Sequence, residues 1–142
     1  MNKKAESFKA FLDEHKIVSF QIDEVQEDRG TVIFRSNFKI YGKNLPMIFV
    51  LDDSPFNTIR VLVVPRALNE SNKVALLQKF DDLNKRYKAI KYYFDTVGNI
   101  VLDYCIFCPD DKISCDLIYY DVLGIIESHL NDEYNQLIQL VN

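Results

Sequence analysis

The sequence lacks long apolar runs, and its four glycines are too scattered to form a phosphate-binding loop. The N-terminal segment, MNKKAESFKAFLDEH, is charged throughout and lacks the apolar core of a secretory signal. No other stretch approaches the roughly 20 apolar residues that span a bilayer. No serine lies in a GxSxG motif. We therefore expect a cytoplasmic protein, with no signal peptide, no membrane contact and no hydrolase or kinase activity.

An excess of positive charge is also missing. The 17 basic and 21 acidic side chains give a formal net charge of −4, so the chain lacks the positive field that nucleic-acid binding usually requires. The cysteines number only three, which in the absence of a secretory signal favours reduced thiols over a disulfide framework. A chain of 142 residues can bury a sizeable core without such links. We expect one domain that spans residues 1–142, and no nucleic-acid partner.

Residues 83–107 predict the end of a helix followed by a tight β-hairpin. The turn falls at residues 96–99, where Gly98 and Asn99 tolerate positive φ. Upstream, apolar residues from 74 to 87 recur at helical spacing, so the helix and the hairpin are expected to pack together. Along the two arms, apolar and charged residues alternate with the period of a half-buried strand; the apolar positions are Ile90, Tyr92, Phe94, Ile100, Leu102, Tyr104 and Ile106.

Hydrophobic spacing predicts the remaining elements. Turns are expected at residues 26–30 and 41–44, and Gly124 and residues 131–132 could divide the last helix in two. The full order is a helix at 3–14, strands at 18–23, 32–40, 45–51 and 58–64, a helix capped by Asn69 or Ser71 that runs to about Tyr87, the hairpin, and a helix from about Ser114 onward. The fold class is therefore α+β: an antiparallel sheet of five to six strands flanked by three helices, in the order α-β-β-β-β-α-β-β-α.

The hairpin region resembles the YbjN-like family of bacterial proteins, which share the type III secretion chaperone-like fold. The matching features are Leu83 and Asn84 near the end of the second helix, the aromatic Tyr87, an arm that ends in Asp95, and a turn that contains Gly98. They cover about 25 residues, and the remaining likeness is one of element order and length. The resemblance implies frequent dimerisation and a binding or chaperone-like role without catalytic residues.

The sharpest chemical motif is Cys105-x-x-Cys108, followed by Cys115. Two thiolates at this spacing can chelate zinc or exchange a disulfide, and a redox pair usually lies at a helix N-terminus. Here Cys105 falls in a predicted strand, and the carboxylates at 110–111 would oppose a thiolate. Zinc would need a further ligand from a histidine. We favour buried thiols with a packing role, and expect no metal and no cofactor.

Other polar candidates are weaker. The paired carboxylates at 52–53 and 110–111 lack a third acid or a histidine nearby in the sequence, which is typical of solvated turns. His15 and His129 lie on predicted helices, and each is interpreted as a packed or rim side chain. We therefore expect a protein that is not an enzyme.

The strand faces predict a candidate binding patch. Strands that are apolar on both faces are expected only where both faces are covered. Three covers remain open: a helix of the same chain, a second copy in a symmetric dimer, or a client peptide laid across the sheet. Met47, Phe49, Ile59, Val61 and Val63 are expected to face the core, and the patch on the other face comprises Ile48, Val50, Leu62, Val64 and Tyr93.

These patterns lead to two hypotheses for function. The leading one is a non-catalytic protein-binding or chaperone-like module that buries apolar surface of a protein partner or of a homodimer mate. The alternative is a small thiol-redox or metal-binding protein centred on Cys105 and Cys108.

Overall fold

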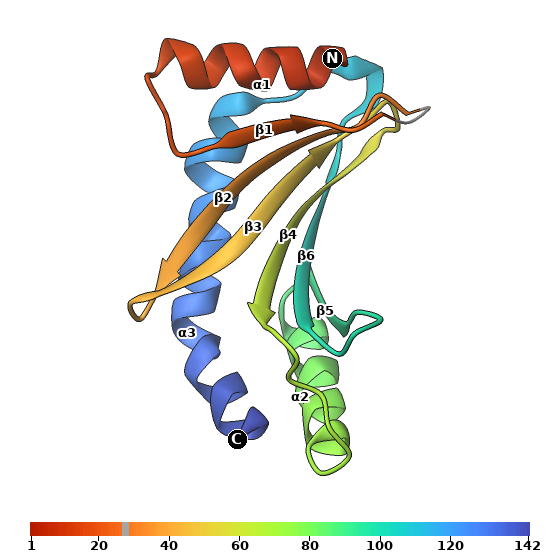
Figure 1. The fold of residues 1–142 in the computed structure, drawn as a ribbon, viewed down its shortest axis with the longest axis vertical. Helices are drawn as coiled ribbons and strands as arrows, with labels where there is room; N and C mark the ends of the chain where they lie inside the picture. Colours follow the sequence, from red (N-terminus) through yellow and green to blue (C-terminus); the bar gives the residue numbers. More distant parts are fainter. Residues whose placement is uncertain (27–28) are drawn as a thin grey trace.

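The computed structural model describes residues 1–26 and 29–142. Within them it has an α+β fold with a six-stranded antiparallel sheet and three α-helices, as predicted (Figure 1). In chain order the elements are α1 (Lys3–Glu14), β1 (Gln21–Glu24), β2 (Val32–Ile40), β3 (Lys43–Leu51), β4 (Phe56–Val64), α2 (Lys73–Arg86), β5 (Ile90–Phe94), β6 (Ile100–Phe107), a 3₁₀ turn (Pro109–Asp111), a π-helical turn (Leu117–Val122) and α3 (Leu123–Val141).

The sheet is open, with the strand order β1-β2-β3-β4-β6-β5. All neighbouring strands are antiparallel. The predicted hairpin therefore joins the sheet through its second arm, β6, and its first arm, β5, forms one edge. The short strand β1 forms the other edge.

The core lies on one face of this sheet. Phe8 of α1 packs edge-on against Phe34 and Phe49, with ring centroids 5.0 and 5.1 Å apart. Ile126 and Leu130 of α3 are fully buried in the same cluster, and α3 runs behind β2 and β3 in Figure 1. The strand residues predicted to face the core are all buried; they are Met47, Phe49, Ile59, Val61 and Val63.

The predicted packing of the second helix on the hairpin is confirmed. The Phe80 ring of α2 lies 5.8 Å from the ring of Tyr92 and 4.8 Å from that of Phe94. The Asn84 amide hydrogen-bonds the backbone of Tyr92 at both ends: its Oδ1 accepts from the N–H at 2.8 Å and its Nδ2 donates to the carbonyl at 3.2 Å. Because β5 is an edge strand, this side chain takes the place of a neighbouring strand there.

The turns of two hairpins, β2–β3 and β5–β6, use residues with positive φ. Tyr41 and Gly42, with φ of 49° and 76°, form a two-residue loop, so β3 begins at Lys43 and the turn is shorter than predicted. In the other hairpin, Gly98 has a φ of 84°. Asn99 is not in that region; its side chain instead hydrogen-bonds the carboxylate of Asp95.

Several boundaries differ from the prediction. The strand expected from residue 18 begins only at Gln21, and Val18 is 93% exposed, because an apolar alternation without a neighbouring strand does not make a ladder. The last helix does not divide at 131–132; α3 is continuous, and the irregular turn lies before Gly124. The predicted turn at 26–30 lies partly outside the described residues.

The cap of the second helix also differs. Its N-cap residue is Asn72, and the Oδ1 atom of Asn69 accepts a hydrogen bond from the Asn72 backbone N–H at 2.9 Å. Asn69 therefore holds the residue that precedes the helix, and neither it nor Ser71 caps the first turn directly.

Candidate protein-binding face of the sheet

The face of the sheet that points away from the helices carries most of the predicted patch. Ile48, Val50, Leu62 and Tyr93 are all half-buried there. They come from β3, β4 and β5, and the strand registers place Leu62 and Tyr93 on either side of Val101. No described helix crosses this side of the sheet, which faces the viewer in Figure 1. Among the described residues, no helix of the same chain therefore covers the patch; a second copy and a client peptide are the two other covers considered. We call this surface the helix-free face.

Val64 does not belong to the helix-free face. A β-bulge between Leu62 and Val64 shifts the register, so that Val64 pairs with Ile100, a fully buried core residue. An extra residue in one strand reverses the alternation of side chains beyond it. Val64 is only 8% exposed, and its inclusion in the predicted patch was wrong.

An ion pair lies at the centre of the helix-free face. Arg60 donates two hydrogen bonds to Asp103, from Nε to Oδ1 at 2.7 Å and from Nη2 to Oδ2 at 2.9 Å. The Tyr93 hydroxyl donates a third to Oδ2 at 2.9 Å. Burial and this bond to a carboxylate raise the pKa of Tyr93 to about 12, and the bonds to Asp103 raise the pKa of Arg60. Asp103, only 7% exposed, thus accepts three hydrogen bonds from these two side chains.

Two exposed aromatic side chains lie at one end of the helix-free face. Phe56 and Phe107, directly paired across β4 and β6, are 61% and 63% exposed, and their ring centroids lie 5.5 Å apart. The sequence pattern missed both, because each lies at the end of its strand beside a proline-containing break. Their meeting depends on the pairing of β4 with β6, which local periodicity does not report.

The structure places the two cysteines of the Cys-x-x-Cys motif in different surroundings. Cys105 is exposed and pairs with Thr58 on the helix-free face, whereas Cys108 is buried. Burial raises the pKa of the Cys108 thiol and also that of Cys115, so both favour the protonated form. Among the described residues, no three His, Cys, Asp or Glu side chains are grouped so as to hold a metal ion.

His129 is a packed side chain, 5% exposed, whereas His15 is exposed. The Nε2 atom of His129 lies 2.7 Å from the hydroxyl of Tyr92, and the ring packs edge-on against Tyr87 at 4.2 Å. Burial lowers the pKa of His129, which favours the neutral ring. Burial also raises the pKa of the Tyr92 hydroxyl, so this hydrogen bond joins two uncharged groups.

Glu133, one helical turn after His129, is the second buried polar group of this cluster. Its Oε1 accepts hydrogen bonds from the Tyr87 hydroxyl at 2.9 Å and from Arg86 at 3.1 Å, and its Oε2 lies 3.3 Å from Lys79 Nζ. Burial alone would raise the pKa of Glu133, but the Tyr87 bond and the two cations lower it overall. The cluster joins the end of α2 to α3, and we assign it a structural role.

Comparison with known proteins adds no functional assignment. No protein-family model matches the chain, and no curated protein matches its sequence. Membership of the YbjN-like family therefore stays a prediction. In the described part of the chain, no helix combines the length and the apolar character needed to cross a membrane.

Proposed function

We propose that the protein is a non-catalytic, chaperone-like protein-binding module whose partner is a second copy of the same chain. The observation that carries the proposal is the helix-free face, on which Ile48, Val50 and Leu62 are only half-buried and the Phe56–Phe107 pair is mostly exposed. Apolar side chains gathered on one face are stabilised when a protein surface replaces the water around them.

The charges of the helix-free face are compatible with the same face of a second copy as its partner. Arg60 is neutralised by Asp103, and Arg35 lies 2.5 Å from Asp23 on the neighbouring strand β1. Because these two arginines are paired within the face and Lys91 lies over the Tyr93 ring, we expect apolar contact rather than charge to dominate the interface. An apolar face can pack against its own copy about a two-fold axis, and such symmetric contacts are the commonest in homo-oligomers.

The test is the molar mass in solution, measured by light scattering behind a sizing column over a wide concentration range. Wild type is expected to be a dimer. Leu62→Asp is expected to raise the dimer dissociation constant by roughly a hundredfold or more, because burying an unpaired carboxylate costs several kcal/mol. Val74→Asp, a matched change at a 67% exposed position on α2, should leave the dimer intact.

Two results would overturn the proposal: a wild-type monomer at every concentration, or a Leu62→Asp variant that stays dimeric. Circular dichroism shows whether each variant is folded. Should Leu62→Asp unfold, Phe107→Ser supplies the same comparison, because the Phe107 side chain is 63% exposed and contributes little to the core.

A further inference from the structure

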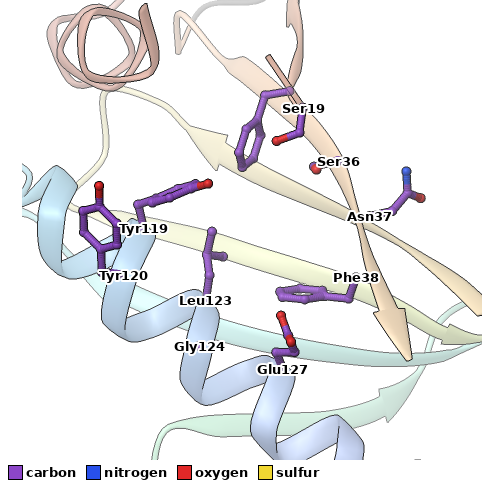
Figure 2. Close-up of a pocket in the computed structure, with 10 residues that line it drawn as sticks. Ser19, Ser36, Asn37, Phe38, Tyr119, Tyr120, Leu123, Gly124 and Glu127 are labelled. Carbon is purple, nitrogen blue, oxygen red and sulfur yellow. The ribbon is translucent and has the colours of Figure 1, made fainter. Parts of the chain in front are cut away.

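A hollow opens where β1 separates from β2. The two strands pair only from Gln21, opposite Arg35, to Glu24, opposite Val32. The preceding residues, Ser19 and Phe20, do not continue the ladder, so β2 from Ser36 onward has no strand partner on this side among the described residues. The gap forms a cavity of about 290 Å³, closed on its far side by the π-helical turn and the start of α3 (Figure 2).

Aromatic and apolar side chains form part of the wall of this hollow. Phe38 of β2 and Tyr119 and Leu123 from the helical side point into the same space in Figure 2. The wide π-helical turn helps to place both Tyr119 and Tyr120 along the rim, and turns of this kind are frequent at functional sites.

Several polar side chains of the hollow are open to solvent: Ser19 and Glu127 are exposed, and Ser36 and Tyr119 are half-buried. The side-chain oxygens of Ser19, Ser36, Tyr119 and Glu127 form no hydrogen bond or ion pair with any other described residue. Figure 2 shows the Glu127 carboxylate beside the Phe38 ring, whereas the Asn37 amide points away. Ligand sites commonly combine apolar and aromatic side chains with a small number of polar groups.

Gly124 leaves the floor of the hollow open. It lines the cavity within a helix, and a Cβ atom at this position would meet nothing within 4 Å. Glycine weakens a helix interior, and no described atom lies close enough to Gly124 to exclude a side chain there. The bare backbone increases the room beside Tyr120 and Glu127.

We infer that this hollow binds a primary alkylammonium group, with Glu127 as its counter-ion. A cation in this hollow would be attracted by the negative charge of the carboxylate and also by the negative faces of the aromatic rings. An anion is repelled by Glu127, and the volume suits a group of side-chain size. The inference is independent of the helix-free face.

The first measurement is a ¹H–¹⁵N NMR titration at pH 7 with n-butylammonium chloride, n-butanol and sodium butyrate. The ammonium is expected to cause saturable shifts at residues 36–38, 119–120 and 127, while butanol of the same size binds at least about tenfold more weakly, because it lacks the charge. Butyrate should cause no such shifts. Equal binding of butanol and the ammonium would overturn the inference.

Variants test the carboxylate directly. Glu127→Gln should weaken n-butylammonium binding about tenfold or more, whereas Glu70→Gln, a matched change at an exposed loop carboxylate, should leave it unchanged. Full binding by Glu127→Gln would overturn the assignment. The ¹H–¹⁵N spectrum shows that each variant is folded, and an unchanged oligomeric state separates this result from the test of the dimer.

Two further probes distinguish the source of the ammonium group. Tighter binding of Nα-acetyl-lysine methylamide than of butylammonium indicates a lysine side chain of a peptide. Tighter binding of 1,4-diaminobutane indicates a free polyamine. Both results support the ammonium site and differ only in what delivers the cation.

Discussion

Acid is expected to destabilise the fold through one residue, His129. Its ring is buried, its Nε2 atom is bonded to Tyr92, and its Nδ1 atom has no hydrogen-bond partner in the described part of the chain. Burial lowers its pKa from the ordinary value of 6.5; Glu133 and Asp132 act against this shift, and the nearby cations assist it. The folded protein therefore binds the proton at lower pH than the unfolded chain does.

The sign of the effect follows from this difference. The contribution of His129 to stability is fully present above pH 6.5 and is lost as the pH falls below it, because the unfolded chain is protonated first. For one proton, the loss between pH 6.5 and 5.5 is about 1 kcal/mol when the folded form stays neutral. The lowered pKa of Glu133 causes a separate loss of stability only as the pH falls below the ordinary value of 4.5. A change in stability between pH 6.5 and 5.5 therefore reports on the histidine.

The assay is urea unfolding at pH 7.5, 6.5 and 5.5, at one protein concentration, for wild type, His129→Gln and His15→Gln. The chain has only these two histidines, so the exposed His15 is a matched control. Wild type and His15→Gln should lose about 1 kcal/mol between pH 6.5 and 5.5. His129→Gln should be less stable at pH 7.5 but lose little further. The reasoning is refuted if His129→Gln keeps the wild-type loss over this window.

Substitutions at Asn84 and at two glycines test other parts of the fold. Asn84→Ala removes both hydrogen bonds to the Tyr92 backbone; we expect a loss of about 1–2 kcal/mol in urea unfolding and faster amide exchange at Tyr92, and unchanged exchange would contradict the edge-protecting role. Gly98→Ala should cost about 1–2 kcal/mol, because φ is +84° and the new Cβ would lie 3.1 Å from Leu68 Cβ. Gly124→Ala should instead stabilise by up to about 1 kcal/mol, since it lies in a helix with free space around it, and the opposite order for the two glycines would refute both assignments.

Periodicity in the sequence predicted the elements that have a local cause. The first helix was predicted at residues 3–14 and is found at Lys3–Glu14, because its apolar residues recur at helical spacing. The hairpin was predicted from the alternation and from Gly98. In the structure its two strands pair the expected apolar residues across the hairpin, such as Tyr92 with Leu102. The alternation also predicted that Ile48 and Leu62 lie on the face opposite the core.

Errors arose where contacts between distant segments decide the outcome. The alternation in the second hairpin arm did not indicate that its charged residue Asp103 is buried, because the ion-pair partner, Arg60, lies 43 positions earlier. Val64 was assigned to the wrong face because a bulge in β4 is a property of its pairing with β6. Phe56 and Phe107 were missed for the same reason.

The sequence by itself determined the α+β class, the order of helices and strands, and which side of each strand is apolar, because these follow from backbone periods of two and 3.6 residues. Only the tertiary structure decided that β6 lies beside β4, that the helices cover one face alone, and that β1 separates from β2 beside Glu127. Those features depend on the free energy of contacts between residues far apart in the chain, to which a local pattern of side chains is insensitive.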